Sequence, residues 1–376
     1  MPTQYRMLIG GEWVAGEETF EVRNPYDGTL LARVPAANRQ DVDRAIEAAQ
    51  RGFTILSQTP AHRRSDILLK TSQLIFENRE EIAQLICKEA GKAVQFSRAE
   101  VSRAIQTFRL ASEEAKRICG ETVPMDAAAG SEGRFGFYIR EPIGIVGAIT
   151  PFNFPLNLVA HKVAPAIAAG DSVVLKPASS TPLTSLRLGE IMLEAGLPEG
   201  GLDIVMGSGS TVGDWIVTDP RLAMISFTGS PPVGKGIRDR AGMKRVCLEL
   251  GSNSAVVLDS DTEIESAIPR LIVGSFANSG QICISIQRIY LHHDLWQPFV
   301  ERFVKAVKGV KVGDPLDQDT VVGPMIDEGE AKRAEGWLKE AVEGGAEILT
   351  GGRRRGTVLE PTVLVKVSQG MKVVCK

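Results

Sequence analysis

The chain has 376 residues, of which 43% are hydrophobic and 24% are charged, and its formal net charge is -3 at pH 7. This composition is typical of a globular protein with two or three domains, and the near-neutral charge offers no general attraction for nucleic acid or an anionic membrane. The most apolar stretch, residues 143–152, is too short to span a membrane, and the first residues lack the features of a signal peptide. Five cysteines, a sparse and odd number, favour a reducing compartment, so we expect a cytoplasmic protein.

The N-terminal part is predicted to begin with antiparallel strands around residues 7–14 and 19–35 and to continue with helices. Apolar residues recur at helical spacing in three stretches, residues 39–53, 62–91 and 97–118. Cys87 and Cys119 lie on the apolar sides of these stretches, and packing in the core is the expected role of both.

Residues 121–140 change to a Gly/Ala loop followed by a strand-like segment, which predicts a β-hairpin arm. Short apolar runs then alternate with helical stretches; the runs are residues 144–149, 172–177, 202–207, 223–229 and 245–251. This alternation predicts an α/β fold with a doubly wound parallel sheet and ligand sites at the carboxyl ends of its strands. A second α/β unit is predicted to begin near residue 254.

Two glycine-rich loops follow predicted strands. Residues 207–213 space their glycines as GxGxxxG, one position away from the dinucleotide-binding fingerprint. Residues 229–235 match a P-loop until Gly236, where Mg²⁺ binding needs Ser or Thr, so an ATPase is disfavoured. The second loop still predicts a helix that starts near Pro231, whose N-terminus either binds a pyrophosphate or makes an ordinary turn.

Five motifs occur in a fixed order: TPFNFP (150–155), SVVLKP (172–177), ISFTGS (225–230), LELGSNS (248–254) and NSGQICIS (278–285). Together they make the chain resemble the NAD(P)-dependent aldehyde dehydrogenase superfamily, from the N-terminal strands to near the last residue. The resemblance implies a Rossmann-type NAD(P)-binding domain over residues 1–120 and 141–250, a β-hairpin oligomerisation arm over 121–140 and a catalytic domain over 251–376. It also implies a homodimer or homotetramer, and a chain that ends before the family's C-terminal segment.

The resemblance identifies Cys283 as the catalytic nucleophile and Glu249 as the general base. Because an aldehyde has no leaving group, a thiolate must add to it before a hydride can leave, and the resulting thioester is then hydrolysed. Asn153 and the backbone N–H of Cys283 are the implied donors to the oxyanion. Lys162 is given only a supporting role, and Cys247 is interpreted as a buried structural thiol. Relatives that transfer the acyl group to coenzyme A typically lack the acid, so Glu249 favours release of a free carboxylate.

The sequence departs from the family pattern at one position shortly after Glu249. Gly251 is followed by Ser252, where the family usually has a second glycine. This restricts the local backbone and the movement expected of the Glu249 side chain.

The cofactor residues implied by the resemblance are Lys176, Ser179, Gly209, Gly229, Ser230 and Phe152. Lys176 is expected to bind the adenosine ribose, and the glycines to let the backbone approach the cofactor. Ser179 stands where NAD-preferring members often carry a Glu that repels a 2′-phosphate. We therefore expect NADP to be accepted and favoured, with NAD also possible, and we expect no metal.

The sequence gives little information about the identity of the substrate. Ile282 replaces the Arg that phosphate-specific relatives place before the nucleophile. Arg103, Arg109 and Asn157 are candidates for the substrate tunnel, where an arginine would suit the carboxylate of a semialdehyde. Such arginines more often form surface ion pairs, and small hydroxyaldehydes such as lactaldehyde are equally open as substrates. The competing function is a non-catalytic binding or structural protein with the same fold.

Overall fold

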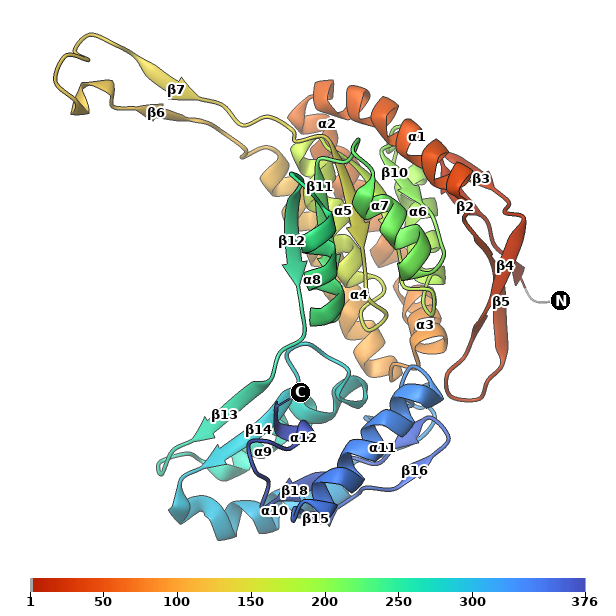
Figure 1. The fold of residues 1–376 in the computed structure, drawn as a ribbon, viewed down its shortest axis with the longest axis vertical. Coiled ribbons are helices and arrows are strands. Elements are labelled where there is room, and N and C mark those ends of the chain that lie inside the picture. The colour runs from red at the N-terminus through yellow and green to blue at the C-terminus, as the bar shows by residue number, and fades with distance from the viewer. Residues whose placement is uncertain (1–2, 376) are drawn as a thin grey trace.

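A seven-stranded sheet lies at the centre of the larger of two α/β units in this computed structural model, which describes residues 3–375 (Figure 1). In spatial order its strands are β12 (Arg245–Glu249), β11 (Met224–Thr228), β8 (Ile145–Ile149), β9 (Ser172–Lys176), β10 (Leu202–Ile204), β2 (Met7–Ile9) and β3 (Glu12–Val14). The first five are parallel, and β2 and β3 add antiparallel strands at one edge. All five predicted apolar runs are strands, which confirms the predicted fold class.

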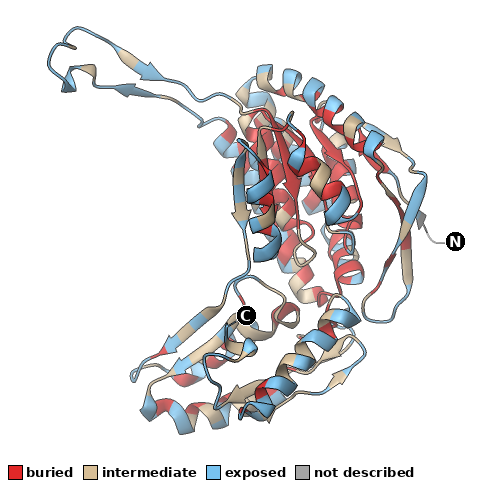
Figure 2. Cartoon of the chain, viewed as in Figure 1, coloured by how far each residue is buried: buried red, intermediate tan, exposed pale blue. Residues whose placement is uncertain are grey.

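Burial explains the composition of these strands. Every residue of β8 and β9 is buried, as expected of parallel strands that are covered on both faces and rich in Val and Ile (Figure 2). The helices of this unit are α1 (Arg39–Gln58), α2 (Ala61–Glu77), α3 (Arg79–Ala90), α4 (Val94–Ala115), α5 (Asn157–Ala169), α6 (Leu183–Glu194), α7 (Asp214–Thr218) and α8 (Pro231–Arg240). A π-helical turn, η2 (Gly209–Gly213), leads into α7.

The predicted helix over residues 62–91 is wrong in one respect, because Asn78 divides it into α2 and α3. The Asn78 side chain donates to the Leu74 carbonyl at 2.8 Å and satisfies a terminal carbonyl of α2, so a new helix starts at the next residue. Cys87 is buried as predicted, and its burial raises the pKa of the thiol to about 12. Cys119 lies beyond the end of α4 and is exposed, which corrects its assignment to the core.

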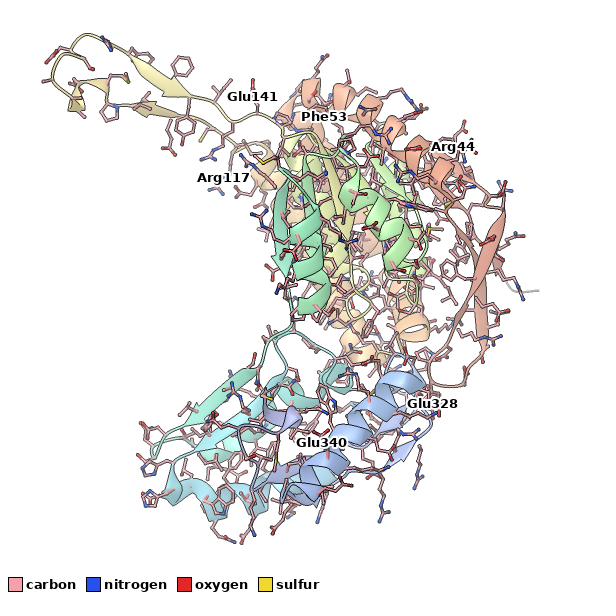
Figure 3. The ribbon with its side chains drawn as sticks, viewed as in Figure 1. Arg44, Phe53, Arg117, Glu141, Glu328 and Glu340 are labelled. Carbon is pink, nitrogen blue, oxygen red and sulfur yellow. The ribbon has the colours of Figure 1, made fainter. Side chains whose placement is uncertain are left out.

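Three further strands form a separate sheet in the order β1 (Thr3–Gln4), β5 (Leu30–Ala36) and β4 (Glu18–Arg23). A hairpin of β6 (Glu121–Val123) and β7 (Gly136–Tyr138) extends away from the body of the molecule (Figure 1). Arg117 and Glu141 mark where its two strands leave the body (Figure 3). Phe135 and Phe137 are 78% and 65% exposed on this hairpin, so it buries no core of its own.

The smaller unit contains the second α/β region predicted from the sequence. Its elements are β13 (Ser254–Leu258), α9 (Ile264–Phe276), η3 (Ala277–Gly280), β14 (Ile286–Leu291), η4 (His293–Leu295), α10 (Trp296–Lys308), α11 (Glu328–Glu343), β15 (Glu347–Thr350), β16 (Arg354–Arg355), β17 (Val358–Leu359), β18 (Val363–Val365) and α12 (Lys372–Cys375). β13 and β14 are parallel neighbours, and α9 and α10 pack together on a small core that includes Leu271 and Phe299.

Between residues 3 and 375, no helix is both long enough and apolar enough to cross a membrane.

Candidate active site

The loop that carries Cys283 has an unusual backbone. Asn278, Ser279 and Gly280 adopt positive φ angles of 51°, 57° and 74°, a conformation that non-glycine residues rarely adopt. The Ser279 hydroxyl donates to the Gly323 carbonyl at 2.8 Å and holds this turn against the following part of the chain. Such strain persists only where the surroundings enforce it, and it is concentrated at functional sites. The turn leaves Cys283 exposed.

Two contacts bring the larger unit to this loop. The side-chain amide of Asn153, in the loop after β8, donates to the Gln281 carbonyl at 2.8 Å. The Ser252 hydroxyl donates to the carbonyl of Cys283. The structure therefore brings both Asn153 and the segment after Glu249 into contact with the cysteine loop.

Glu249 ends β12 and shares its surroundings with two basic residues of α5. Lys162 is buried and donates to the Ser226 hydroxyl at 3.2 Å. Burial lowers the pKa of Lys162 to about 8, and the charge of Glu249 opposes that shift. Burial also lowers the pKa of His161, with further effects of Arg103 and Lys162 in the same direction and of Glu249 in the opposite one. His161 was missed in the sequence, where a lone histidine on a helix carries no signal.

A buried ion pair anchors the start of α5. Lys92 and Glu100 lie 2.5 Å apart with exposures of 1% and 0%. The second oxygen of Glu100 accepts hydrogen bonds from the backbone N–H groups of Leu156 and Asn157, where the positive end of the helix dipole favours a carboxylate. The Lys92 ammonium also lies 3.6 Å from the ring centre of Phe154. This pair fixes the segment that presents Asn153, and no sequence motif indicated it.

The ribose-binding candidates lie at the carboxyl end of β9. Lys176 is buried, its ammonium donates to the Pro177 carbonyl at 2.8 Å, and burial lowers its pKa to about 8. The Ser179 hydroxyl donates to the Gly207 carbonyl at 2.8 Å, so its proton is already engaged. A side chain at Gly209 would meet no other atom within 4 Å, so this glycine borders open space. A buried ammonium at the carboxyl end of a parallel strand is compatible with a polar nucleotide.

The loop before α8, residues 229–230, lacks the free N–H group at Gly229 that was expected to bind a pyrophosphate. The Gly229 N–H donates to the Glu249 carbonyl at 3.0 Å, so it is not free to bind a pyrophosphate. A Cβ at Gly229 would lie 2.4 Å from the ring of Phe227, so close packing against this ring requires glycine at the position. The helix begins at Pro231 as predicted, but its first two residues are prolines without N–H groups. Ser230 is exposed and its hydroxyl donates to no partner within residues 3–375.

Phe152 is partly exposed in the loop that also carries Asn153. That position is compatible with the apolar wall expected from the resemblance.

The three substrate candidates lie in different environments. Arg103 is exposed on α4 and has no ion pair in the described part of the chain. Arg109 forms an exposed ion pair with Glu113 at 3.3 Å. This is the surface ion pair that was the alternative to a role in substrate binding. Asn157 is buried, and its side-chain oxygen accepts from the Thr107 hydroxyl at 3.1 Å.

Two other groups could carry chemistry. Cys247 is exposed on β12, an edge strand of the described sheet, so its interpretation as a buried thiol is wrong. His292, His293 and Asp294 have ligand atoms within 4.8 Å of one another, but they follow the far end of β14 from Cys283.

Comparison with known proteins covers almost the whole chain. The model of the aldehyde dehydrogenase family matches residues 13–376. A 3-sulfolactaldehyde dehydrogenase of Priestia megaterium is 44% identical over 370 residues, which are 98% of this chain and 77% of that protein. The lactaldehyde dehydrogenase of Methanocaldococcus jannaschii is 39% identical and covers 95% of this chain and 77% of its own length.

The fold gives the same result. Aldehyde dehydrogenase 21 of Physcomitrella patens, solved in complex with its reaction product succinate, superposes with a TM-score of 0.97 at 42% identity. That comparison covers 100% of this chain and 79% of the other. The chain therefore belongs to the aldehyde dehydrogenase family and is an NAD(P)-dependent aldehyde dehydrogenase.

Proposed function

We propose that this enzyme oxidises a small anionic aldehyde to a carboxylate through a covalent intermediate on Cys283. The observation that carries this proposal is the hydrogen bond from the Asn153 amide to the Gln281 carbonyl, two residues before the cysteine. It supports an oxyanion donor and a nucleophile held in one site by residues of both units.

The proposed steps follow from the groups at this site. The Cys283 thiolate adds to the carbonyl carbon, and the oxyanion of the thiohemiacetal receives hydrogen bonds from the Asn153 amide and the Cys283 N–H. That N–H donates to no acceptor among residues 3–375, which supports the role. A bound nicotinamide cofactor would supply the hydride acceptor, and loss of the hydride lets the oxyanion re-form the C=O bond and give the Cys283 thioester. Glu249 then removes a proton from the water that attacks the thioester, and Cys283 leaves as the thiolate.

For the cofactor, we propose that Lys176 binds the adenosine ribose and that NADP is accepted. The support is the absence of a carboxylate at Ser179, which would repel a 2′-phosphate. Because the Ser179 hydroxyl already donates to Gly207, phosphate binding rests on the Lys176 charge rather than on the serine.

For the substrate, we propose that Arg103 binds an anionic group of the aldehyde. The support is that Arg103 is exposed on α4 without an ion pair among residues 3–375, and that its charge, like that of Glu249, acts on the pKa of His161. The names of the relatives agree with an anionic or hydroxylated aldehyde, since they act on 3-sulfolactaldehyde and lactaldehyde.

The first experiment is reduction of NADP or NAD followed by absorbance, with an aldehyde panel that contains succinate semialdehyde, lactaldehyde and propionaldehyde. We expect turnover by the protein and by Cys119→Ala, a matched control for an exposed thiol, and none by Cys283→Ala. Binding of cofactor without reduction of it by any aldehyde would favour the competing non-catalytic function.

The second experiment tests substrate selection. We expect Arg103→Gln to lower kcat/KM about tenfold for the anionic aldehyde and to leave propionaldehyde unchanged. Arg109→Gln is the matched control because that arginine is paired with Glu113 on the same helix. Equal losses for charged and neutral aldehydes would contradict the role of Arg103.

A further inference from the structure

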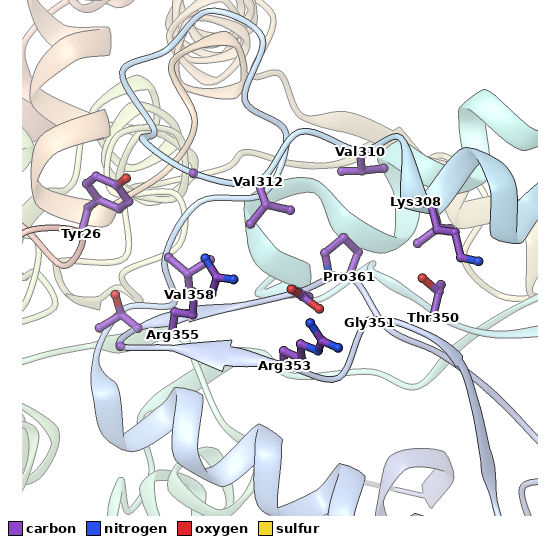
Figure 4. Close-up of a pocket in the computed structure, with 15 residues that line it drawn as sticks. Tyr26, Lys308, Val310, Val312, Thr350, Gly351, Arg353, Arg355, Val358 and Pro361 are labelled. Atoms are coloured by element: carbon purple, nitrogen blue, oxygen red, sulfur yellow. The ribbon is translucent and has the colours of Figure 1, made fainter.

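A cavity of about 700 Å³ lies mainly in the smaller unit, and Cys283 does not line it. Its walls come from the end of α10, from the segment with β16 and β17, and from Tyr26 of the larger unit (Figure 4). The volume is within the range of cavities that bind small molecules. The Thr357 hydroxyl donates to the Pro25 carbonyl at 2.7 Å and ties the two units together beside this cavity.

Three consecutive arginines, residues 353–355, have different environments, and two of them line the cavity. The Arg354 side chain is 18% exposed and pairs with Glu335 at 3.0 Å and Glu328 at 3.7 Å, both on α11 (Figure 3 labels Glu328). Successive side chains of an extended strand point to opposite faces, so its two neighbours point away from α11. Arg353 and Arg355 accordingly line the cavity, about 6.6 Å apart along an extended backbone.

The cavity has an excess of positive charge. Arg353, Arg355 and Lys308 line it, and none of the three forms an ion pair within residues 3–375. Glu360 is the acidic residue of the lining, so three cations face one carboxylate. Figure 4 shows Arg355 toward the Tyr26 end and Lys308 toward the other end, so the positive charge extends along the cavity.

We propose that this cavity binds a small organic molecule that carries two phosphate groups. Arginine presents a planar set of donors that matches phosphate oxygens. The cations come from two different walls, Lys308 from the end of α10 and Arg353 and Arg355 from the β16 segment, which suits two anionic groups better than one. The Thr350 hydroxyl and the Tyr26 ring add a polar contact and an aromatic wall. The site is distinct from the dehydrogenase site, and the proposal does not depend on turnover.

The test is calorimetric titration with inorganic pyrophosphate and with fructose 1,6-bisphosphate, with NADP at saturation to occupy the nucleotide site. We expect binding of one or both probes, and about tenfold or greater weakening in Arg353→Gln/Arg355→Gln, since each lost charge-assisted hydrogen bond has an effect of that order. Arg354→Gln is the matched control, and its affinity is expected to equal that of the unchanged protein.

Absence of binding of both probes to the unchanged protein would overturn the proposal, and so would an equal loss in the double variant and the Arg354→Gln control. A protein that binds a probe at this cavity but oxidises no aldehyde would contradict the proposed function and leave this inference standing.

Discussion

At the residue scale, some residues of the candidate site can be predicted from sequence motifs, and others become visible only in the fold. Cys283, Glu249 and Asn153 lie in motifs with recognisable neighbours, so the sequence predicts them. His161 and the Lys92–Glu100 pair do not, because their environments come from packing between α4 and α5. The state of Ser179 was equally hidden, since its hydrogen-bond partner Gly207 is 28 residues away.

We predict that Glu249→Gln separates acylation from hydrolysis. Without a carboxylate to activate water, steady-state turnover is expected to fall about 10²- to 10⁴-fold, while one equivalent of reduced cofactor still forms in a burst. Rapid-mixing absorbance and mass spectrometry of the trapped acyl-enzyme measure the two steps. Loss of the burst together with turnover would assign Glu249 to an earlier step.

The cofactor proposal gives a second prediction at this scale. Ser179→Glu is expected to lower kcat/KM for NADP at least tenfold and to raise the preference for NAD, because a carboxylate repels the 2′-phosphate. Ser180→Glu, at the next exposed position, is the control. An unchanged ratio of the two kcat/KM values in Ser179→Glu would refute the argument.

At the element scale, the sequence predicts which segments are strands, but it does not predict which strand lies at an edge. β8 (IVGAI) carries no charged residue and is central and wholly buried, while β12 (RVCLE) has Arg245, Cys247 and Glu249 at alternate positions and has alternating exposure. This difference explains the wrong assignment of Cys247. The break at Asn78 was also hidden, because the apolar periodicity continues across it from α2 into α3.

Asp203 on β10 leads to a prediction about pH and stability. One of its oxygens accepts from the Gly10 N–H at 2.6 Å, the other is buried without a partner among residues 3–375, and burial raises the pKa of this carboxyl to about 7. The folded state therefore binds a proton more tightly than the unfolded state, whose carboxyl has a pKa near 3.8. Its contribution to stability is consequently lost as pH rises from about 4 through about 7.

Asp203→Asn removes this titration and keeps an acceptor for Gly10. We expect the difference in melting temperature between pH 5 and pH 8 to become smaller in the variant than in the unchanged protein. Thermal unfolding followed by circular dichroism at the two pH values measures it. Equal differences in both proteins would show that Asp203 ionises normally.

The hairpin of β6 and β7 is the other element with a testable role. Its exposed Phe135 and Phe137 have no core to join within one chain, so we propose that it docks on a second copy. Phe135→Ser/Phe137→Ser is expected to shift a dimer or tetramer toward monomer in analytical ultracentrifugation. A protein that is already monomeric at micromolar concentration would contradict the proposal.

At the scale of the whole molecule, one buried pair connects helix packing to the site. Lys92→Met leaves the Glu100 carboxylate buried without its cation, and we expect a loss of about 3–5 kcal/mol in the free energy of unfolding. Lys92→Met/Glu100→Gln is expected to recover much of this loss, since no buried charge remains. Chemical denaturation of both variants tests the prediction, and equal losses would contradict it.

The contact between Asn153 and Gln281 bears on how the enzyme loses activity when it is heated. The proposed reaction centre is shared between two separately packed units, so a small movement of one unit against the other would separate Asn153 from the cysteine loop while each hydrophobic core stays intact. Moderate heating is therefore expected to abolish activity at a temperature below that at which the helices unfold, and cooling is expected to restore the activity.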